Sequence, residues 1–334
     1  MTGGTYREVR LASRPPGPLT DDAFEIVEQP VPSPRRGQVL VRSTVMAVAA
    51  VMRTLMDDHT GLPMPSYALG EPLTGPAIGE VLAAPGTGLR PGDLVQHRLG
   101  WREYALLEES AARRIEPGVL PGPAAYLSQG PTAWMGVVRG AQVQAGDTVF
   151  VSGAAGGVGS LAGQIARLRG AARVIGSTGS PDKAERLIAE LGYDAVVIRG
   201  AGPMAEQLRA AAPYGLDAVV DNVGGEQLEA AIAVAGRGAR LALVGALDSQ
   251  LSGAGPRRTE IDTLALLSRS ITLRGLALHD HLDLVPEWYQ RFGQGLRDGT
   301  LTFPHVRLHG IGQAPGALRE LIEGRHVGAV LVEL

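Results

Sequence analysis

A glycine-rich loop between an apolar stretch and an amphipathic stretch constrains the fold of this chain most. Residues 149–160 read VFVSGAAGGVGS, and LAGQIARLRG follows. Gly153, Gly156 and Gly159 are three residues apart, a GxxGxxG variant of the GxGxxG dinucleotide-binding fingerprint. Small residues let the backbone approach a pyrophosphate, and the start of the next helix adds unpaired N–H groups and a positive dipole end. We interpret the loop as a pyrophosphate cradle, although a glycine-rich turn without a ligand can have the same local sequence.

Apolar and amphipathic stretches continue to alternate after this loop. The pattern predicts strands at 148–152, 173–177, 195–198, 218–221, 240–244 and 271–278, and helices at 159–169, 182–191, 204–211 and 227–235. Strands that alternate with helices predict a parallel, doubly wound sheet with helices on both faces. This α/β context favours a ligand-binding loop over a plain turn.

The two ends of the chain have a different pattern. Residues 1–125 are rich in β-branched residues between Gly and Pro turns, with a loop at 62–76, and predict a β-rich domain. The last thirty or so residues return to a strand, a helix and a strand. We therefore expect a β-rich first part at 1–126, a dinucleotide-binding domain at 127–299, and a return segment of the first domain at 300–334.

Composition excludes several classes of protein. The chain has 334 residues, a net charge of −3 and 4% aromatic residues, so a nucleic-acid-binding surface is not expected. It has no cysteine, which excludes disulfides, thiol nucleophiles and thiolate zinc sites. The start has no apolar core after a basic patch, and no apolar run approaches the roughly 18 residues needed to span a bilayer. We expect a cytoplasmic protein with no membrane partner.

The end of the second expected strand indicates which dinucleotide is bound. NAD sites place an acidic residue there, whereas this chain has Ser177 and Thr178, and its first acid, Asp182, suits the first turn of the next helix. Lys183 follows at once, and Arg199 ends the third strand. Hydroxyls with two cations favour the 2′-phosphate of NADPH, unless both cations are simply solvated.

Two further loops follow the fourth and fifth expected strands. VVDNVGGE at 219–226 contains Asn222, and LVGALDSQ at 243–250 contains Gly245. Ligands of doubly wound sheets bind at the carboxyl ends of the strands, so these loops are expected to line the far wall of the cofactor site. Each could also be an ordinary turn.

With these motifs in place, the chain resembles the medium-chain dehydrogenase/reductase superfamily. It is most similar to the zinc-independent branch of prostaglandin reductases, leukotriene B4 dehydrogenases and alkenal double-bond reductases. The resemblance covers nearly the full length, and is most specific between residues 149 and 226. The matching stretches are VAAVMR (48–53), LGEPLTGPAIGEV (69–81), GPTAW (130–134), the glycine loop with its helix, GSPDKAERLIAELGYD (179–194), DNVGGE (221–226) and VGA (244–246).

The resemblance implies a GroES-like, β-rich catalytic domain interrupted by a Rossmann domain. It also implies NADPH as cofactor, a homodimer, no metal, and hydride transfer to the β-carbon of an α,β-unsaturated carbonyl. In relatives Arg199 is often Tyr, and His326 is often Asn near the nicotinamide. The cofactor contacts carried over from the family or expected from the strand ends are Thr132, Gly156, Gly157, Val158, Gly159, Ser177, Thr178, Lys183, Arg199, Asn222, Val244, Gly245, Ala246, Leu276, Ala277, Leu278 and His326.

The chain departs from these relatives at the expected substrate side. Relatives have Tyr where this chain has Val51, and a second Tyr at the position of Gln250. Gln250 has amide donors that could hold a developing oxyanion, or it could face solvent. Arg53 and Leu278 complete the candidate substrate contacts, although a structural ion pair suits Arg53 better.

These observations favour an NADPH-dependent ene-reductase that acts on a small or mid-sized apolar enone. One alternative is an NADPH quinone oxidoreductase. The other is a nucleotide-binding protein of the same fold with little redox turnover, and the absence of both tyrosines is the reason to consider it. His279 and His281 could face the substrate and donate a proton, but a surface position is the simpler expectation.

Overall fold

The computed structural model describes residues 4–58, 61–62, 64–250 and 258–334. The chain divides into two compact units, which differ in their secondary structure. The first unit consists of Met1–Ser128, His305–Arg325 and Ala329–Leu334. The second consists of Gln129–Pro304 and His326–Gly328.

The second unit is built on a six-stranded parallel sheet with strand order β10-β9-β8-β11-β12-β13. The order reverses between β8 and β11, which are neighbours in the sheet although β9 and β10 separate them in sequence. Such a reversal leaves a crevice at the carboxyl ends of the strands, where doubly wound folds bind their ligands. The Rossmann sheet predicted from the sequence is confirmed. Its strands are β8 (Thr148–Val151), β9 (Arg173–Thr178), β10 (Ala195–Ile198), β11 (Leu216–Asp221), β12 (Ala235–Leu243) and β13 (Thr272–Gly275).

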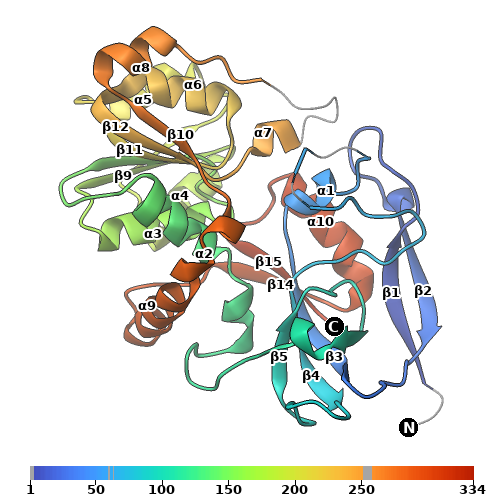
Figure 1. The fold of residues 1–334 in the computed structure, drawn as a ribbon. Coiled ribbons are helices and arrows are strands. Elements are labelled where there is room, and N and C mark those ends of the chain that lie inside the picture. Colours follow the sequence, from blue (N-terminus) through green and yellow to red (C-terminus); the bar gives the residue numbers. More distant parts are fainter. Residues whose placement is uncertain (1–3, 59–60, 63, 251–257) are drawn as a thin grey trace. The chain divides into compact units, whose positions relative to one another are not determined.

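Helices cover both faces of this sheet (Figure 1). Helix α3 (Gly159–Leu168) contacts α4 (Pro181–Leu191), whereas α5 (Met204–Ala211), α6 (Gly225–Val234) and α8 (Thr263–Arg269) contact one another in sequence order. In α4, Ala184, Leu187 and Leu191 are buried, a spacing that places them on the same face of a helix. Pro181 opens α4, and Gly192 ends it with φ +71°.

Two strand predictions were wrong at their ends. The strand expected at 240–244 is β12, which begins at Ala235, directly after α6, and pairs there with Leu216 of β11. The strand expected at 271–278 ends at Gly275. Its neighbour β12 ends at Leu243. The N–H of Leu276 donates to the carbonyl of Leu243 at 3.0 Å, which is the last hydrogen bond between this segment and β12. Ala277 remains extended outside the sheet, and Leu278 begins a 3₁₀ helix, Leu278–Asp280.

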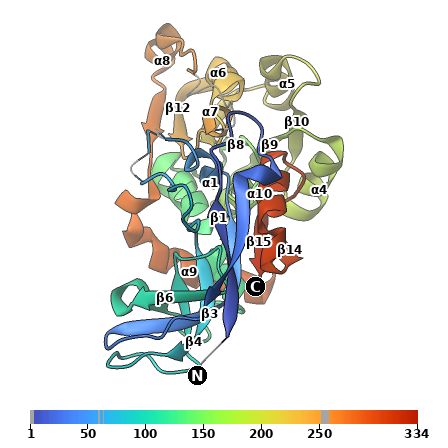
Figure 2. The same ribbon diagram turned by 90° about the vertical axis from the view of Figure 1, so that its right-hand side faces the viewer.

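The first unit contains a seven-stranded sheet with order β14-β15-β3-β4-β5-β7, and β6 pairs with β3. A separate antiparallel pair, β1 and β2, begins the chain. Figure 2 shows the C-terminal strands β14 and β15 in red beside α10. β15 pairs antiparallel with β3, which joins the end of the chain to the β-rich sheet. The strands are β1 (Thr5–Leu11), β2 (Phe24–Pro30), β3 (Gln38–Val48), β4 (Ala77–Ala83), β5 (Leu94–His97), β6 (Tyr104–Glu108), β7 (Arg113–Arg114), β14 (His305–His309) and β15 (Ala329–Glu333).

The remaining α-helices are short, except α9 and α10. They are α1 (Val51–Thr54), α2 (Gly130–Trp134), α7 (Leu247–Gln250), α9 (Val285–Asp298) and α10 (Ala314–Ile322). Within the described ranges, none of the helices combines the length and the apolar character that crossing a bilayer requires.

Candidate functional site

The glycine loop connects β8 to α3, as predicted, and close backbone packing explains two of its glycines. Gly153 has φ +58°, a conformation that side chains with a Cβ rarely adopt. A Cβ on Gly159 would lie 2.4 Å from the carbonyl oxygen of Gly153 and 2.6 Å from Cα of Ala154. Since both neighbours are backbone atoms, only glycine fits at the start of α3.

Three backbone amides at this end of α3 have no acceptor. The N–H groups of Gly157, Val158 and Gly159 make no hydrogen bond within the described parts of the chain. Gly156 is exposed, so the loop is open to solvent there. Free N–H groups and the positive dipole end of a ten-residue helix are what a pyrophosphate requires.

Residues from distant parts of the sequence hold the loop in this shape. The hydroxyl of Tyr193 donates to the carbonyl of Gly159 at 2.6 Å, and burial raises the pKa of this phenol. The N–H of Gly328 donates to the carbonyl of Ala155 at 2.8 Å. Neither residue was predicted from the sequence, because no local pattern connects either of them to the loop.

Ser177 also supports the loop. Its hydroxyl accepts a hydrogen bond from the N–H of Gly153 at 2.9 Å and is paired with Oε1 of Gln227. The side chain is almost fully buried, with 1% of its surface exposed. Ser177 was predicted as a cofactor contact; the structure places it behind the loop, where its hydroxyl is engaged by the protein. Thr178, the next residue, ends β9 and is also buried.

Asn222 lies beside the loop with an unused acceptor. Its Nδ2 donates to the carbonyl of Ser152 at 2.7 Å, which orients the carboxamide. Its Oδ1 is shielded from solvent and has no hydrogen-bond partner among the described residues. Gly245 is next to it, since a Cβ there would lie 2.7 Å from the carbonyl oxygen of Asn222. The two loops predicted to line the far wall therefore meet.

A buried carboxylate anchors this wall. Asp221 accepts hydrogen bonds from the hydroxyl of Ser152 at 2.6 Å and from the N–H of Gly224 at 2.9 Å. Burial raises the pKa of Asp221, and these hydrogen bonds oppose that rise. The same Ser152 hydroxyl accepts from the N–H of Asn222 at 2.8 Å, so this network fixes the backbone that carries Asn222.

Lys183 and Arg199 form a pair of like charges near the end of β9. The guanidinium of Arg199 lies over Gly179, where a Cβ would be 2.9 Å from Nη2. Burial, and then the charge of Arg199, lowers the pKa of Lys183. No carboxylate of the described residues pairs with either cation. Two uncompensated cations beside Thr178 suit a phosphate dianion.

The remaining predicted cofactor contacts are spread over several elements. Thr132 lies in α2, which contacts α3. Val244 and Ala246 follow β12, and Leu276 to Leu278 follow β13. His326 precedes Gly328, which pairs with Gly156 of the glycine loop. The groups around the loop fit a dinucleotide: free N–H donors for phosphates, an unused acceptor for a hydroxyl, and two cations.

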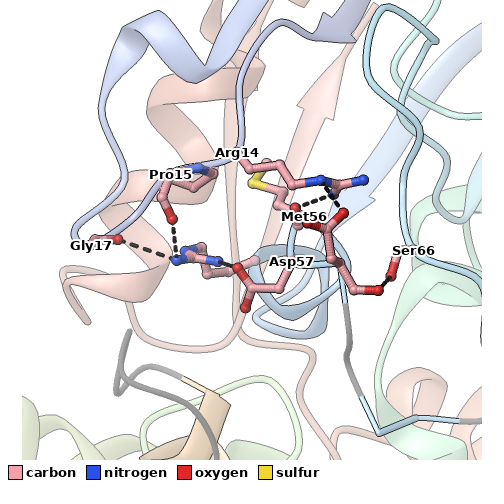
Figure 3. A network of polar contacts seen from close by, with 8 residues as sticks. Arg14, Pro15, Gly17, Met56, Asp57 and Ser66 are labelled. Atoms are coloured by element: carbon pink, nitrogen blue, oxygen red, sulfur yellow. Dashed lines mark hydrogen bonds and ion pairs between the residues drawn. The ribbon is translucent and has the colours of Figure 1, made fainter.

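Arg53 is a structural residue of the first unit. Arg53 is 5% exposed, and its guanidinium donates to Asp57 at 2.8 Å and to the carbonyls of Pro15 and Gly17 at 3.0 and 3.2 Å. Figure 3 shows this network beside the contacts of Arg14. Arg53 thus joins α1 to the loop before β2, as the simpler expectation had it.

The other candidate substrate residues have fewer contacts. Val51 begins α1 and packs against the core of the first unit. Gln250 ends α7, where its N–H donates to the carbonyl of Ala246 at 2.9 Å; residues 251–257 after it lie outside the described ranges. His279 is exposed beside Asp280, and Nδ1 of His281 lies 3.5 Å from the guanidinium of Arg139.

Known proteins with this sequence pattern identify the family. Residues 7–115 match the family described as the N-terminal domain of oxidoreductase, and residues 157–292 match the family described as zinc-binding dehydrogenase. The putative NADP-dependent oxidoreductase YfmJ of Bacillus subtilis (strain 168) is 33% identical over 99% of this chain and 98% of its own length. The chain belongs to the zinc-independent branch of the medium-chain dehydrogenase/reductase superfamily. The absence of cysteine is consistent with that branch.

Two further relatives of this medium-chain reductase match along nearly the whole chain. The NADPH-dependent curcumin reductase of Escherichia coli (strain K12) is 29% identical over 97% of the chain and 95% of its own length. The crystal structure of CurA from Vibrio vulnificus in complex with NADPH superimposes with a TM-score of 0.90, at 29% identity and 98% coverage of both chains. Both units of the medium-chain reductase therefore have counterparts in a solved structure.

Proposed function

We propose that this medium-chain reductase uses NADPH to reduce the conjugated C=C bond of an α,β-unsaturated carbonyl compound of small or mid-sized apolar type. The observation that carries the proposal is the set of unpaired groups along the carboxyl edge of the Rossmann sheet. Three free amides, the unused oxygen of Asn222, and the cation pair of Lys183 and Arg199 match a dinucleotide with a 2′-phosphate. The NADPH complex of CurA and the curcumin reductase support the same cofactor and the same class of reaction.

Each part of this site would have a separate task. The amides of Gly157, Val158 and Gly159 would hold the pyrophosphate, and Lys183 with Arg199 would hold the 2′-phosphate. NADPH would supply a hydride to the β-carbon of the substrate, and the electron pair of the C=C bond would move toward the carbonyl to give an enolate, which takes a proton at the α-carbon from solvent. The enolate oxygen would be negative, so a donor that is already oriented lowers the barrier, and the loss of one such donor costs about 2.7–4 kcal/mol.

We assign that donor to the side-chain amide of Gln250, and the apolar surface beside the substrate to Val51. Gln250 stands where relatives have a phenol, and an amide N–H can replace a phenol O–H as a donor to an oxyanion. Val51 has no polar group, which favours an apolar substrate over one that needs a second hydrogen bond. Gln250→Leu is expected to lower kcat about a hundredfold while the Kd of NADPH stays unchanged.

The test is to mix purified protein and NADPH with a panel of alkenals and cyclic and aryl enones, and to follow the absorbance of the reduced cofactor. Turnover of enones that exceeds turnover of quinones supports the proposal. The opposite ranking favours the quinone oxidoreductase, since that enzyme would share the same cofactor site. Measurable NADPH binding with no turnover of any enone or quinone would refute both and favour a nucleotide-binding protein without redox turnover.

We further propose that the protein forms the homodimer that its family resemblance implies. In the second unit, β13 pairs only with β12 among the described strands, so one edge of the sheet is open. Leu264 and Leu267 of α8 are 70% and 78% exposed, and burial in a dimer would remove that apolar surface from water. Light scattering coupled to size exclusion measures the molar mass, and a monomer at micromolar concentration would overturn the assignment.

A further inference from the structure

The side chain of Gln129 lies directly on the glycine loop, although no sequence motif connects them. A Cβ on Gly157 would lie 2.2 Å from Oε1 of Gln129 and 2.8 Å from its Cδ. The carboxamide therefore lies against the backbone of Gly157, which has no positive φ.

The backbone of Gln129 is held firmly at this place. Its carbonyl accepts from the N–H of Ala133 at 3.2 Å in the first turn of α2. The next residue, Gly130, packs against the indole of Trp288, where a Cβ would lie 2.1 Å from Cζ2. Trp288 is fully buried and stacks on Phe292 at a centroid distance of 4.6 Å. The core of the second unit thus fixes the backbone from which the Gln129 side chain extends.

The Oε1 atom of Gln129 is shielded from solvent and has no hydrogen-bond partner among the described residues. A buried acceptor without a donor destabilises a folded protein, and such groups in native structures usually serve a ligand or water. The N–H groups of residues 157–159 are donors, but none of them makes a hydrogen bond to this oxygen. The loop and Gln129 together therefore present unpaired donors and an unpaired acceptor within one small region.

A dinucleotide has the complementary pattern. Its phosphates only accept hydrogen bonds at neutral pH, so they suit the free amides and cannot satisfy Gln129. The hydroxyls of the two riboses that flank the pyrophosphate are donors as well as acceptors. We infer that Oε1 of Gln129 accepts a hydrogen bond from a ribose hydroxyl next to the pyrophosphate of the bound cofactor, and that Gln129 positions the cofactor on the loop. This inference rests on the cofactor site proposed above, and adds to it a residue that no family motif assigned.

Gln129→Met tests the inference, because methionine has nearly the same length and lacks the amide. The free variant is expected to be at least as stable to heat as the natural protein, since an unpaired buried acceptor is removed. The Kd of NADPH, measured by fluorescence titration, is expected to rise roughly threefold to tenfold, the range for one neutral hydrogen bond. A purely structural glutamine would change stability without changing the Kd.

Gln144→Met is the matched control. Gln144 belongs to the same unit and is exposed, and it makes no side-chain hydrogen bond. The control is expected to change neither the melting temperature nor the Kd. Gln129→Ala removes the same acceptor without adding a thioether, and keeps the inference testable if the methionine variant does not fold.

Titration with adenosine 2′,5′-bisphosphate identifies the ribose. This probe has the adenosine ribose and lacks the nicotinamide ribose, so an equal loss of its affinity in Gln129→Met assigns the hydroxyl to the adenosine side. Unchanged affinity for the probe, with weaker NADPH binding, assigns it to the nicotinamide side. Unchanged Kd values for NADPH in both Gln129 variants overturn the inference, whereas a natural protein that binds no NADPH overturns the proposed function itself.

Discussion

Arg199→Ala is expected to weaken the binding of NADPH and to leave the binding of NADH unchanged. Arg199 and Lys183 are two cations near the end of β9 that no described carboxylate neutralises. A 2′-phosphate carries nearly two negative charges, so its binding would offset the repulsion between the two cations and form charge-assisted hydrogen bonds with them. NADH has a hydroxyl in that place and gains neither.

The magnitude follows from the exposure of the arginine. A hydrogen bond to a charged group contributes about 1.5–3 kcal/mol when it is sheltered from water. Arg199 is exposed, so solvent screening reduces this contribution to about 1–2 kcal/mol. The Kd of NADPH should therefore rise roughly fivefold to thirtyfold in Arg199→Ala, while the Kd of NADH stays the same. The NADPH effect should also shrink as salt is added, because exposed charges are screened.

The assay is a titration of cofactor fluorescence with NADPH and with NADH at constant ionic strength. Arg186→Ala is the matched control, since Arg186 carries the same charge on α4 but is paired with Glu190 at 3.1 Å. It should leave both affinities unchanged. Equal weakening of NADPH and NADH by Arg199→Ala would refute the reasoning, because the arginine would then act on the fold of the site rather than on the 2′-phosphate.

Variants at three further positions test other parts of the structure. Gly159→Ala places a Cβ 2.4 Å from a backbone atom and should lower the free energy of unfolding by about 1–3 kcal/mol. It should also weaken the binding of NADPH and of NADH equally. A variant with unchanged stability and unchanged affinities would contradict this close packing. Arg53→Ala leaves the carbonyls of Pro15 and Gly17 without their donor and should lower the free energy of unfolding in urea by about 2–3 kcal/mol. Arg53→Lys should restore only part of this loss. An unchanged urea midpoint in Arg53→Ala would contradict a stabilising role of these hydrogen bonds. His97 is 2% exposed, and burial lowers its pKa to about 4, so its neutral form is favoured in the folded protein. The pKa of a histidine in the unfolded chain is near 6.5, so the free energy of unfolding should fall by up to about 3 kcal/mol as the pH is lowered from 6.5 to 4. His97→Asn should make the free energy of unfolding less dependent on pH in this range, and an unchanged pH dependence would contradict the role of His97.

Much of the Rossmann unit could be predicted from the sequence, because its signals are local. Apolar strands, amphipathic helices and the glycine loop each depend on residues that are close in the chain. β10 and α5 were predicted with the bounds that the structure has. The strand ends that failed, at Ala235 and Gly275, were set by neighbours in the sheet that the local pattern does not contain.

By itself, the sequence determined the parallel sheet, the position of the glycine loop, and the family to which the chain belongs. Only the tertiary structure decided what surrounds that loop. Tyr193, Gly328 and Gln129 approach it from distant positions in the chain, and each does so through a contact of one side chain or one amide with the loop backbone. Such contacts carry no periodicity and no motif, because they depend on how β8, α2 and α3 pack rather than on which residues follow one another. The unpaired acceptor of Gln129 became visible only when that packing was known.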